Sequence, residues 1–206
     1  MACVEKFTMS AVVNQLRHIE RTIATPSNPD IDPTRSYKNY SLIEPREISS
    51  YDYFLKRKQE LYCYNRDDVK VMAGWVVTAP ADLASEQEHL FFEKTSQFLQ
   101  ERYGRENTIQ SIVHYDESGR PHLHHYFIPA SYDAKHNRYK ICAAEVLTPL
   151  DLRNFHPALD RFLKGAGINC SVITGITREI GGSISVEDLK KAEKILEHKH
   201  QRGFTW

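Results

Sequence analysis

One stretch constrains the fold of this chain more than any other: residues 108–128, in which two alternating apolar runs flank a turn. Ser118-Gly-Arg-Pro121 supplies the turn chemistry of a hairpin. Side chains on a strand point alternately to its two faces, so His122 and His124 share one face. Pairing in a hairpin brings His114 to that same face. The sequence therefore predicts two antiparallel strands with three imidazoles gathered on one side.

Three imidazoles on one metal ion leave coordination positions open, which is typical of a catalytic rather than a closed structural site. We therefore predict a metal site formed by His114, His122 and His124. Zinc, manganese, iron and copper all accept such a ligand set. His125 is an alternative to His124, because a one-residue bulge would exchange their faces. A cupin-type site also uses His-x-His, but the Glu that it needs is missing from residues 126–129.

The rest of the chain alternates between helix and strand patterns. Strands joined by hairpins and separated by long helices predict an α+β fold, in which an antiparallel sheet is flanked by helices. We expect one domain over residues 1–206. Besides the hairpin, the predicted strands are 4–8, 69–78, 139–147 and 170–174. The first predicted helix follows a cap at Ser10, and the second runs from a cap at Ser49 or Ser50 to Tyr62. The remaining predicted helices cover 82–103, run from Thr148 to 165–167, and cover 186–199.

Composition restricts the functional classes only loosely. We expect a cytoplasmic protein without membrane contact, because there is no apolar run of spanning length and no signal peptide. The formal net charge of zero argues against a uniformly basic nucleic-acid binder, although local clusters can still form a binding groove. Scattered solvated charges are the plainer interpretation of each cluster. The four cysteines are too dispersed for a disulfide framework, so we expect reduced core residues at Cys3, Cys63, Cys142 and Cys170.

Three sequence elements combine into a more specific pattern. The hairpin reads His114-x-Asp116-Glu117-x-x-x-Pro121-His122-x-His124, and His18-x-x-Arg21 lies upstream of it. Between them come residues 27–32 and 39–42, rich in Asn, Asp and Pro. In this order the elements resemble the MobV (Mob/Pre) plasmid mobilisation relaxases, a branch of the HUH endonucleases. The resemblance spans most of residues 7–130, and the hairpin turn is one residue longer than the usual family pattern.

The resemblance implies a central antiparallel sheet and an enzyme that nicks one DNA strand at an origin of transfer, during mobilisation of a plasmid or another mobile element. A covalent 5′-phosphoryl enzyme would keep the bond energy for resealing the strand. The implied cofactor is a divalent cation, manganese or magnesium, which would polarise the scissile phosphate. The implied partners are single-stranded or hairpin DNA at the origin and further relaxosome proteins.

The resemblance also implies residue roles. His114, His122 and His124 would hold the metal, while His18 would attack the phosphate, since the unperturbed pKa of imidazole is about 6.5 and leaves it largely neutral near pH 7. Tyr40 and Tyr37 are the rival nucleophiles, because tyrosine serves elsewhere in the superfamily. Glu117 would orient or deprotonate His18, Arg21 would contact phosphate, and Asp116 would support a ligand histidine. The expected DNA-contacting residues are Arg17, Arg21, Asn28, Asp30, Asn39, Tyr40, Lys56 and Arg57.

Two other functions remain alternatives. The first is a non-catalytic module that binds DNA at an origin, as a repressor or an assembly factor, with a purely structural metal. The second is a hydrolase of small phosphodiesters, with which the neutral net charge agrees. DNA binding without cleavage would identify the module, and turnover of a mononucleotide diester would identify the hydrolase.

Overall fold

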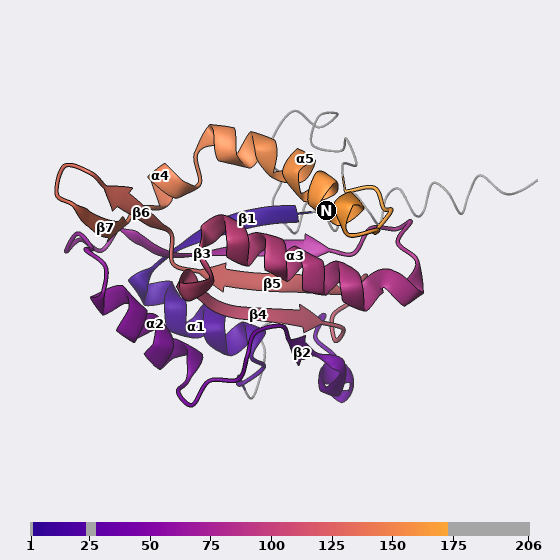
Figure 1. Ribbon diagram of the computed structural model, residues 1–206. Coiled ribbons are helices and arrows are strands. Elements are labelled where there is room, and N and C mark those ends of the chain that lie inside the picture. The colour runs from indigo at the N-terminus through magenta and orange to yellow at the C-terminus, as the bar shows by residue number, and fades with distance from the viewer. Residues whose placement is uncertain (1, 24–27, 173–206) are drawn as a thin grey trace, which may run out of the picture. The chain divides into compact units, whose positions relative to one another are not determined.

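A five-stranded antiparallel sheet organises the computed structural model, which describes residues 2–23 and 28–172 (Figure 1). The strand order is β1-β3-β5-β4-β2, and every neighbouring pair is antiparallel. The expected α+β class is thereby confirmed. The strands are β1 (Ala2–Thr8), β2 (Tyr40–Ser41), β3 (Lys70–Thr78), β4 (Thr108–His114) and β5 (His122–Phe127).

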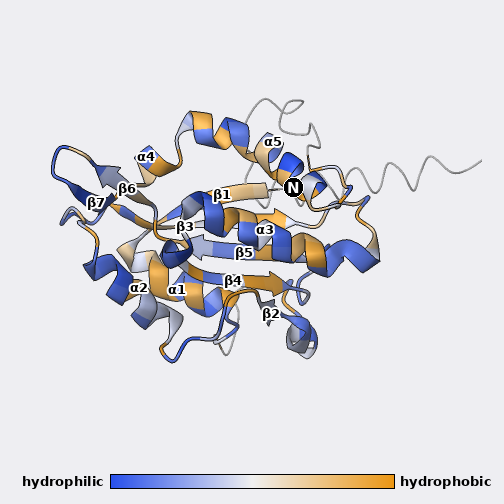
Figure 2. Ribbon diagram, in the orientation of Figure 1, coloured by the Kyte–Doolittle hydropathy of each residue, from blue (hydrophilic) through white to orange (hydrophobic). Residues whose placement is uncertain are grey.

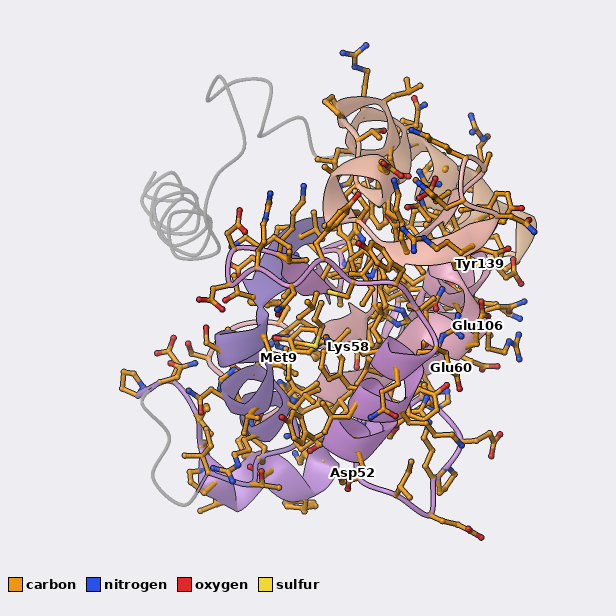
Figure 3. All side chains as sticks on the ribbon, turned by 90° about the vertical axis from the view of Figure 1, so that its left-hand side faces the viewer. Met9, Asp52, Lys58, Glu60, Glu106 and Tyr139 are labelled. Carbon is orange, nitrogen blue, oxygen red and sulfur yellow. The ribbon has the colours of Figure 1, made fainter. Side chains whose placement is uncertain are left out.

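Helices cover both faces of the sheet (Figure 1). On one face, α3 (Glu88–Tyr103) and α5 (Pro149–Gly165) form a core in which the rings of Trp75 and Phe155 stack at 3.6 Å. On the other face lie α1 (Met9–Ile19) and α2 (Ser50–Gln59), with Phe54 fully buried between them and the sheet. Figure 3 shows this second pair from the side, with Met9 at the start of α1 and Asp52 in the first turn of α2.

Helix ends follow the predicted capping chemistry in most places. The hydroxyl oxygens of Ser49 and Thr148 each accept a hydrogen bond from a backbone N–H three residues later, at the starts of α2 and α5. Gly104 ends α3 with a φ of 94°, which favours glycine. The cap expected at Ser10 is wrong: β1 runs directly into α1, so Thr8 holds the capping position.

The hairpin prediction is confirmed in its register. His114 is paired with His122 and Ile112 with His124, across β4 and β5. These two strands lie inside the sheet, flanked by β3 and β2. Figure 2 shows that β5 is mostly hydrophilic in spite of this position, whereas β4 is mainly hydrophobic. All six residues of β5 are buried, so polar rings have been placed in the interior.

Some expected elements differ. The predicted strand 139–147 is confirmed only over residues 139–141, where β7 (Arg138–Ile141) pairs with β6 (Ala130–Asp133) in a separate sheet. Its second part is wrong, because a short helix, α4 (Ala143–Val146), follows. Periodicity alone does not separate a short buried strand from a helical turn. The helix predicted over 82–103 begins only at Glu88, after a 3-10 turn at Ser85–Gln87.

Residues 170–172 are not in a strand, and the remainder of that predicted strand and the helix predicted over 186–199 lie outside the described residues. The single domain over 1–206 therefore stays a prediction. All four cysteines are free thiols, but only Cys170 is buried. Within 2–23 and 28–172, no helix has both the length and the apolar character needed to cross a membrane.

Candidate metal centre

The structure brings His114, His122 and His124 together on the α1 side of the sheet. The ring of His124 lies 4.6 Å from that of His114 and 4.9 Å from that of His122, measured between centroids. Glu117 joins them, and one ligand atom from each of the four residues lies within 4.8 Å of the others. All four residues are buried. A set of three imidazoles and one carboxylate suits manganese, zinc or iron.

Two observations on the histidines fit a metal. His114 Nε2 lies 2.8 Å from the backbone oxygen of Ile19, which can only accept, so Nε2 carries the proton and the lone pair is on Nδ1. Both ring nitrogens of His124 are buried with no hydrogen-bond partner among the described residues. Burial, reinforced by the charge of Arg21, lowers the pKa of His114 to about 4, and burial lowers the pKa of His124 well below its usual value. Neutral imidazole is the form that binds metal ions.

Glu117 was expected to act on His18, not to stand among the ligands. Its Oε1 lies 3.8 Å from both His114 Nδ1 and His122 Nε2, and 4.0 Å from His18 Nε2. The longer hairpin turn therefore leaves the carboxylate in the cluster. The alternation of side chains along a strand does not predict where Glu117 points, because this residue belongs to the turn.

Arg21 connects the cluster to the end of α1. Its Nη1 donates to the backbone oxygen of His18 at 2.8 Å, and its Nε donates to Asp116 at 2.8 Å. Its Nη2 lies 2.8–3.0 Å from three acceptors, on Asp116, Glu117 and His114, but carries only two hydrogens. Arg21 was expected to contact phosphate, yet nearly all of its donors are engaged within the protein. Its backbone is left-handed, with a φ of 55°, and its side chain reaches back to the last turn of α1 through the bond to His18.

Asp116 supports the arginine rather than a histidine. Its side chain is fully buried and accepts from Arg21 through both oxygens and from the Ser36 hydroxyl at 2.6 Å. Burial alone would raise the pKa of this carboxyl, but the hydrogen bonds from Arg21, Ser36 and Asn39 hold it well below its usual value. Asp116 was expected to bond to a ligand histidine directly, but it acts on His114 only by holding Arg21, which contacts both residues.

His18 is the accessible imidazole at the centre. It lies in the last turn of α1, its side chain is 29% exposed, and its ring is 6.1 Å from that of His124. Tyr40 lies elsewhere: it pairs with Val113, whose side chain is on the α3 face, and its ring stacks on His89 at 5.3 Å. Tyr37 is 80% exposed on a separate 3-10 turn. Of the three proposed nucleophiles, the structure places only His18 beside the cluster.

His125 is directed to the opposite face. Its Nδ1 lies 3.2 Å from the hydroxyl of Ser111, which in turn contacts Ser96 on α3. Burial lowers the pKa of His125 to about 3. The choice of His124 over His125, made from strand parity, agrees with this geometry.

The other predicted site residues are divided. Asn28 donates to Glu117 Oε2 at 3.3 Å, and the Asp30 backbone N–H donates to Asn28, so this loop reaches the cluster. Asn39 accepts from the backbone of Tyr115 at 2.8 Å, and Arg17 is exposed on the last turn of α1. Lys56 and Arg57, on α2, lie far from the histidine cluster. Arg57 donates to Asn107, which directly precedes β4, whereas His114 is the last residue of β4, about 20 Å further along the strand.

Comparisons with known proteins place the chain in a family. Residues 1–170 match a family model described as plasmid recombination enzyme (Mob_Pre). A plasmid recombination enzyme of Bacillus thuringiensis is 30% identical over 170 residues, which cover 77% of this chain and 38% of that protein. One of Streptococcus agalactiae is 28% identical over 220 residues, covering 99% and 42%. The chain thus spans about two fifths of the length of these relatives.

Two solved structures share the fold. Both are the MobM relaxase domain bound to oriT DNA of plasmid pMV158, with manganese. One is 24% identical with a TM-score of 0.72 and covers 93% of this chain and 97% of the other. The second is 26% identical with a TM-score of 0.67 and covers 82% and 88%.

Proposed function

Because the chain belongs to the Mob/Pre family of plasmid recombination enzymes, as its motifs indicated, we propose that it nicks DNA as a relaxase. In this proposal it is a metal-dependent, site-specific endonuclease and strand transferase that cuts one strand at an origin of transfer and serves plasmid mobilisation. One observation carries the proposal: an accessible imidazole, His18, lies beside a buried cluster of three histidines and one glutamate. The MobM relaxase domain, 26% identical, is bound to oriT DNA and manganese, which supports origin DNA as partner and a divalent cation such as manganese as cofactor.

The proposed reaction is a transesterification at phosphorus. An imidazole nitrogen of His18 forms a bond to phosphorus, and the bond from phosphorus to the 3′ oxygen breaks. The electron pair leaves on that oxygen, which takes a proton from solvent and becomes a free 3′-hydroxyl. The 5′ side stays on the enzyme as an N-linked phosphoryl group, so the strand can be resealed by the reverse reaction.

The protein's own groups divide the remaining work. His114, His122, His124 and Glu117 hold the divalent cation, which when bound polarises a phosphate oxygen and stabilises the charge that develops on it. Glu117 also lies close enough to His18 to orient the imidazole or take its proton after a small movement. Arg21 positions Glu117 and the end of α1 through its fixed hydrogen bonds.

The DNA path is proposed from the accessible residues next to His18. Arg17, Asn28 and Asp30 lie on α1 or on the loop that reaches Glu117, and they are the first candidates. Lys56 and Arg57 would contact DNA only if it extended along β4 toward α2.

The test is formation of a covalent adduct. The 206-residue chain is incubated with manganese and an oligonucleotide carrying the origin of its own plasmid or element, then separated under denaturing conditions, and the DNA-linked peptide is mapped by mass. We expect an adduct on His18, lost in His18→Ala and retained in Tyr40→Phe. An adduct that persists in His18→Ala and disappears in Tyr40→Phe would overturn the assignment.

Two further measurements on the wild-type chain, binding of origin DNA and turnover of a mononucleotide diester, separate the alternative functions. Tight origin binding by the wild-type chain without any adduct supports the non-catalytic module. Turnover of a mononucleotide diester, with no preference for origin DNA, supports the small phosphodiester hydrolase.

A further inference from the structure

A small cavity beside the metal centre has no role in the reaction described above. Its volume is about 200 Å³. The end of α1 forms one wall, and the segment leading into β2 forms another. The lining residues are Ile19, Glu20, Arg21, Ser36, Asn39, Tyr40, Ser41 and Ile112.

The cavity lies one step from the histidine cluster. Ile112 precedes His114 by two residues on β4 and is paired with His124, so its side chain shares their face about 7 Å away. Arg21 contacts His114 and also lines the cavity, so this residue borders both spaces. A group held in the cavity would therefore be a direct neighbour of a phosphate placed over the histidines.

The chemistry of the lining suits a neutral, flat, polar ring. Ile19 and Ile112 supply an apolar surface, and Ser36 and Asn39 supply polar groups at its border, whereas the hydroxyl of Ser41 donates to Gln110 at 3.2 Å. The carboxylate of Glu20 offsets the positive charge of Arg21, whose donors are nearly all engaged within the protein, so the lining carries no net positive charge that would attract a phosphate. Its volume is below the roughly 300–1,000 Å³ of pockets for drug-sized ligands, which leaves room for one ring system.

We propose that this cavity binds one nucleobase of the cut strand, turned out of the stack next to the scissile phosphate. The inference rests on the proposed function, which brings that strand to His18. The Glu20 carboxylate is held in place by the hydroxyl of Ser50 and the amide of Gln110. It would accept an amino N–H of the base, which favours adenine, cytosine or guanine over thymine. Extruding a base costs little in a strand that is already single.

Ser41 offers a matched pair of variants. It is exposed and paired with Ile112, so its side chain lies on the cavity face of β2. Ser41→Phe fills the cavity, whereas Ser41→Ala removes only the hydroxyl. Thermal unfolding of both variants first establishes that they are folded.

The experiment is a double-mutant cycle between protein and DNA. Affinity of the 206-residue chain is measured by fluorescence anisotropy for the origin oligonucleotide on which the adduct locates the nick, and for versions with a single abasic site at each position near the nick. For the wild-type chain and Ser41→Ala, we expect one abasic position to lower affinity by roughly tenfold. Ser41→Phe should bind the intact oligonucleotide about tenfold more weakly and be insensitive at that position.

The outcomes separate the two proposals. An adduct on His18 together with equal sensitivity of all three proteins to every abasic site overturns the base-binding cavity and leaves the nicking function intact. Absence of an adduct with the wild-type chain overturns both. A sensitive position that tolerates thymine as well as its native base contradicts the role given to Glu20.

Discussion

At the scale of single residues, the centre depends on the direction in which each imidazole points. His124 and His125 are consecutive, yet one lies in the cluster and the other contacts Ser111 on the opposite face. The same contrast holds for the nucleophile candidates, since His18 lies beside the cluster and Tyr40 packs on the α3 face. Neighbouring side chains therefore provide controls for one another.

The two consecutive histidines give the first prediction. His124→Ala should lower the affinity for Mn²⁺ by at least about tenfold, because it removes one of the four ligands. His125→Ala should leave that affinity within about twofold but lower the free energy of unfolding by roughly 1–3 kcal/mol, since a buried hydrogen-bonded ring is lost. Isothermal titration calorimetry and urea unfolding measure the two quantities. Equal losses of Mn²⁺ affinity in both variants would contradict the proposed ligand set.

Arg21 gives the second prediction. A lysine cannot reproduce the planar fork to Asp116 together with the bond to the His18 carbonyl. As a positioning residue, Arg21→Lys should slow adduct formation by at least about tenfold and leave origin affinity within about threefold. Single-turnover rates and anisotropy check this, with the exposed Arg17→Lys as the control. If instead affinity and its salt dependence fall with the rate, Arg21 binds phosphate.

At the scale of elements, the hairpin β4–β5 carries the three histidines of the cluster, and β5 is paired with strand β3 on its other side. Gly74 on β3 is paired with Tyr126 on β5. A Cβ at Gly74 would collide with the ring of Tyr126, whose hydroxyl donates to Gln15 of α1 at 2.9 Å. The absence of a side chain at Gly74 thus allows α1 and the hairpin to be joined through this tyrosine.

The third prediction concerns this contact. Gly74→Ala should lower the free energy of unfolding by roughly 1–3 kcal/mol, as expected for overpacking in a tight core. The double variant Gly74→Ala, Tyr126→Val should lose less than the sum of the two single variants, because the collision is then absent. Urea unfolding of the four proteins completes the cycle. If the losses of the two single variants simply add in the double variant, the ring of Tyr126 does not collide with the Cβ of residue 74.

At the scale of the whole molecule, helices on both faces bury the sheet, and three of its histidines become neutral as a result. Burial lowers the pKa of His114 to about 4 and of His125 to about 3, and it holds the pKa of His124 low as well. In the unfolded chain these imidazoles titrate near a pKa of about 6.5. The folded state therefore binds fewer protons than the unfolded state between these values.

The fourth prediction follows from this difference. The stabilisation is complete above about pH 6.5 and is lost as the pH falls toward the folded pKa values, with a slope of up to about 1.4 kcal/mol per pH unit for each imidazole. Urea unfolding in EDTA at pH 7, 6 and 5 should show decreasing stability, with a shallower slope in His125→Ala. Stability that is constant or increases on acidification would contradict the burial of neutral histidines.

Local patterns in the sequence were sufficient for much of the fold. The alternation of residues 108–114 predicts β4, the capping residues Ser49 and Thr148 predict the starts of two helices, and parity selects His124. They fail in the apolar segment 143–147, where a short run fits a strand as well as a helical turn.

The sequence by itself determined that three imidazoles share a face, because strand alternation depends only on positions two apart. Only the tertiary structure decided what surrounds them. Arg21 and Asp116 are 95 residues apart, and their contact depends on how α1 packs on the sheet. The same packing sets Glu117 among the histidines, turns Tyr40 to the other face and leaves a cavity beside Ile112. The periodicity of the sequence does not predict such contacts, because they depend on how whole helices and strands pack against one another.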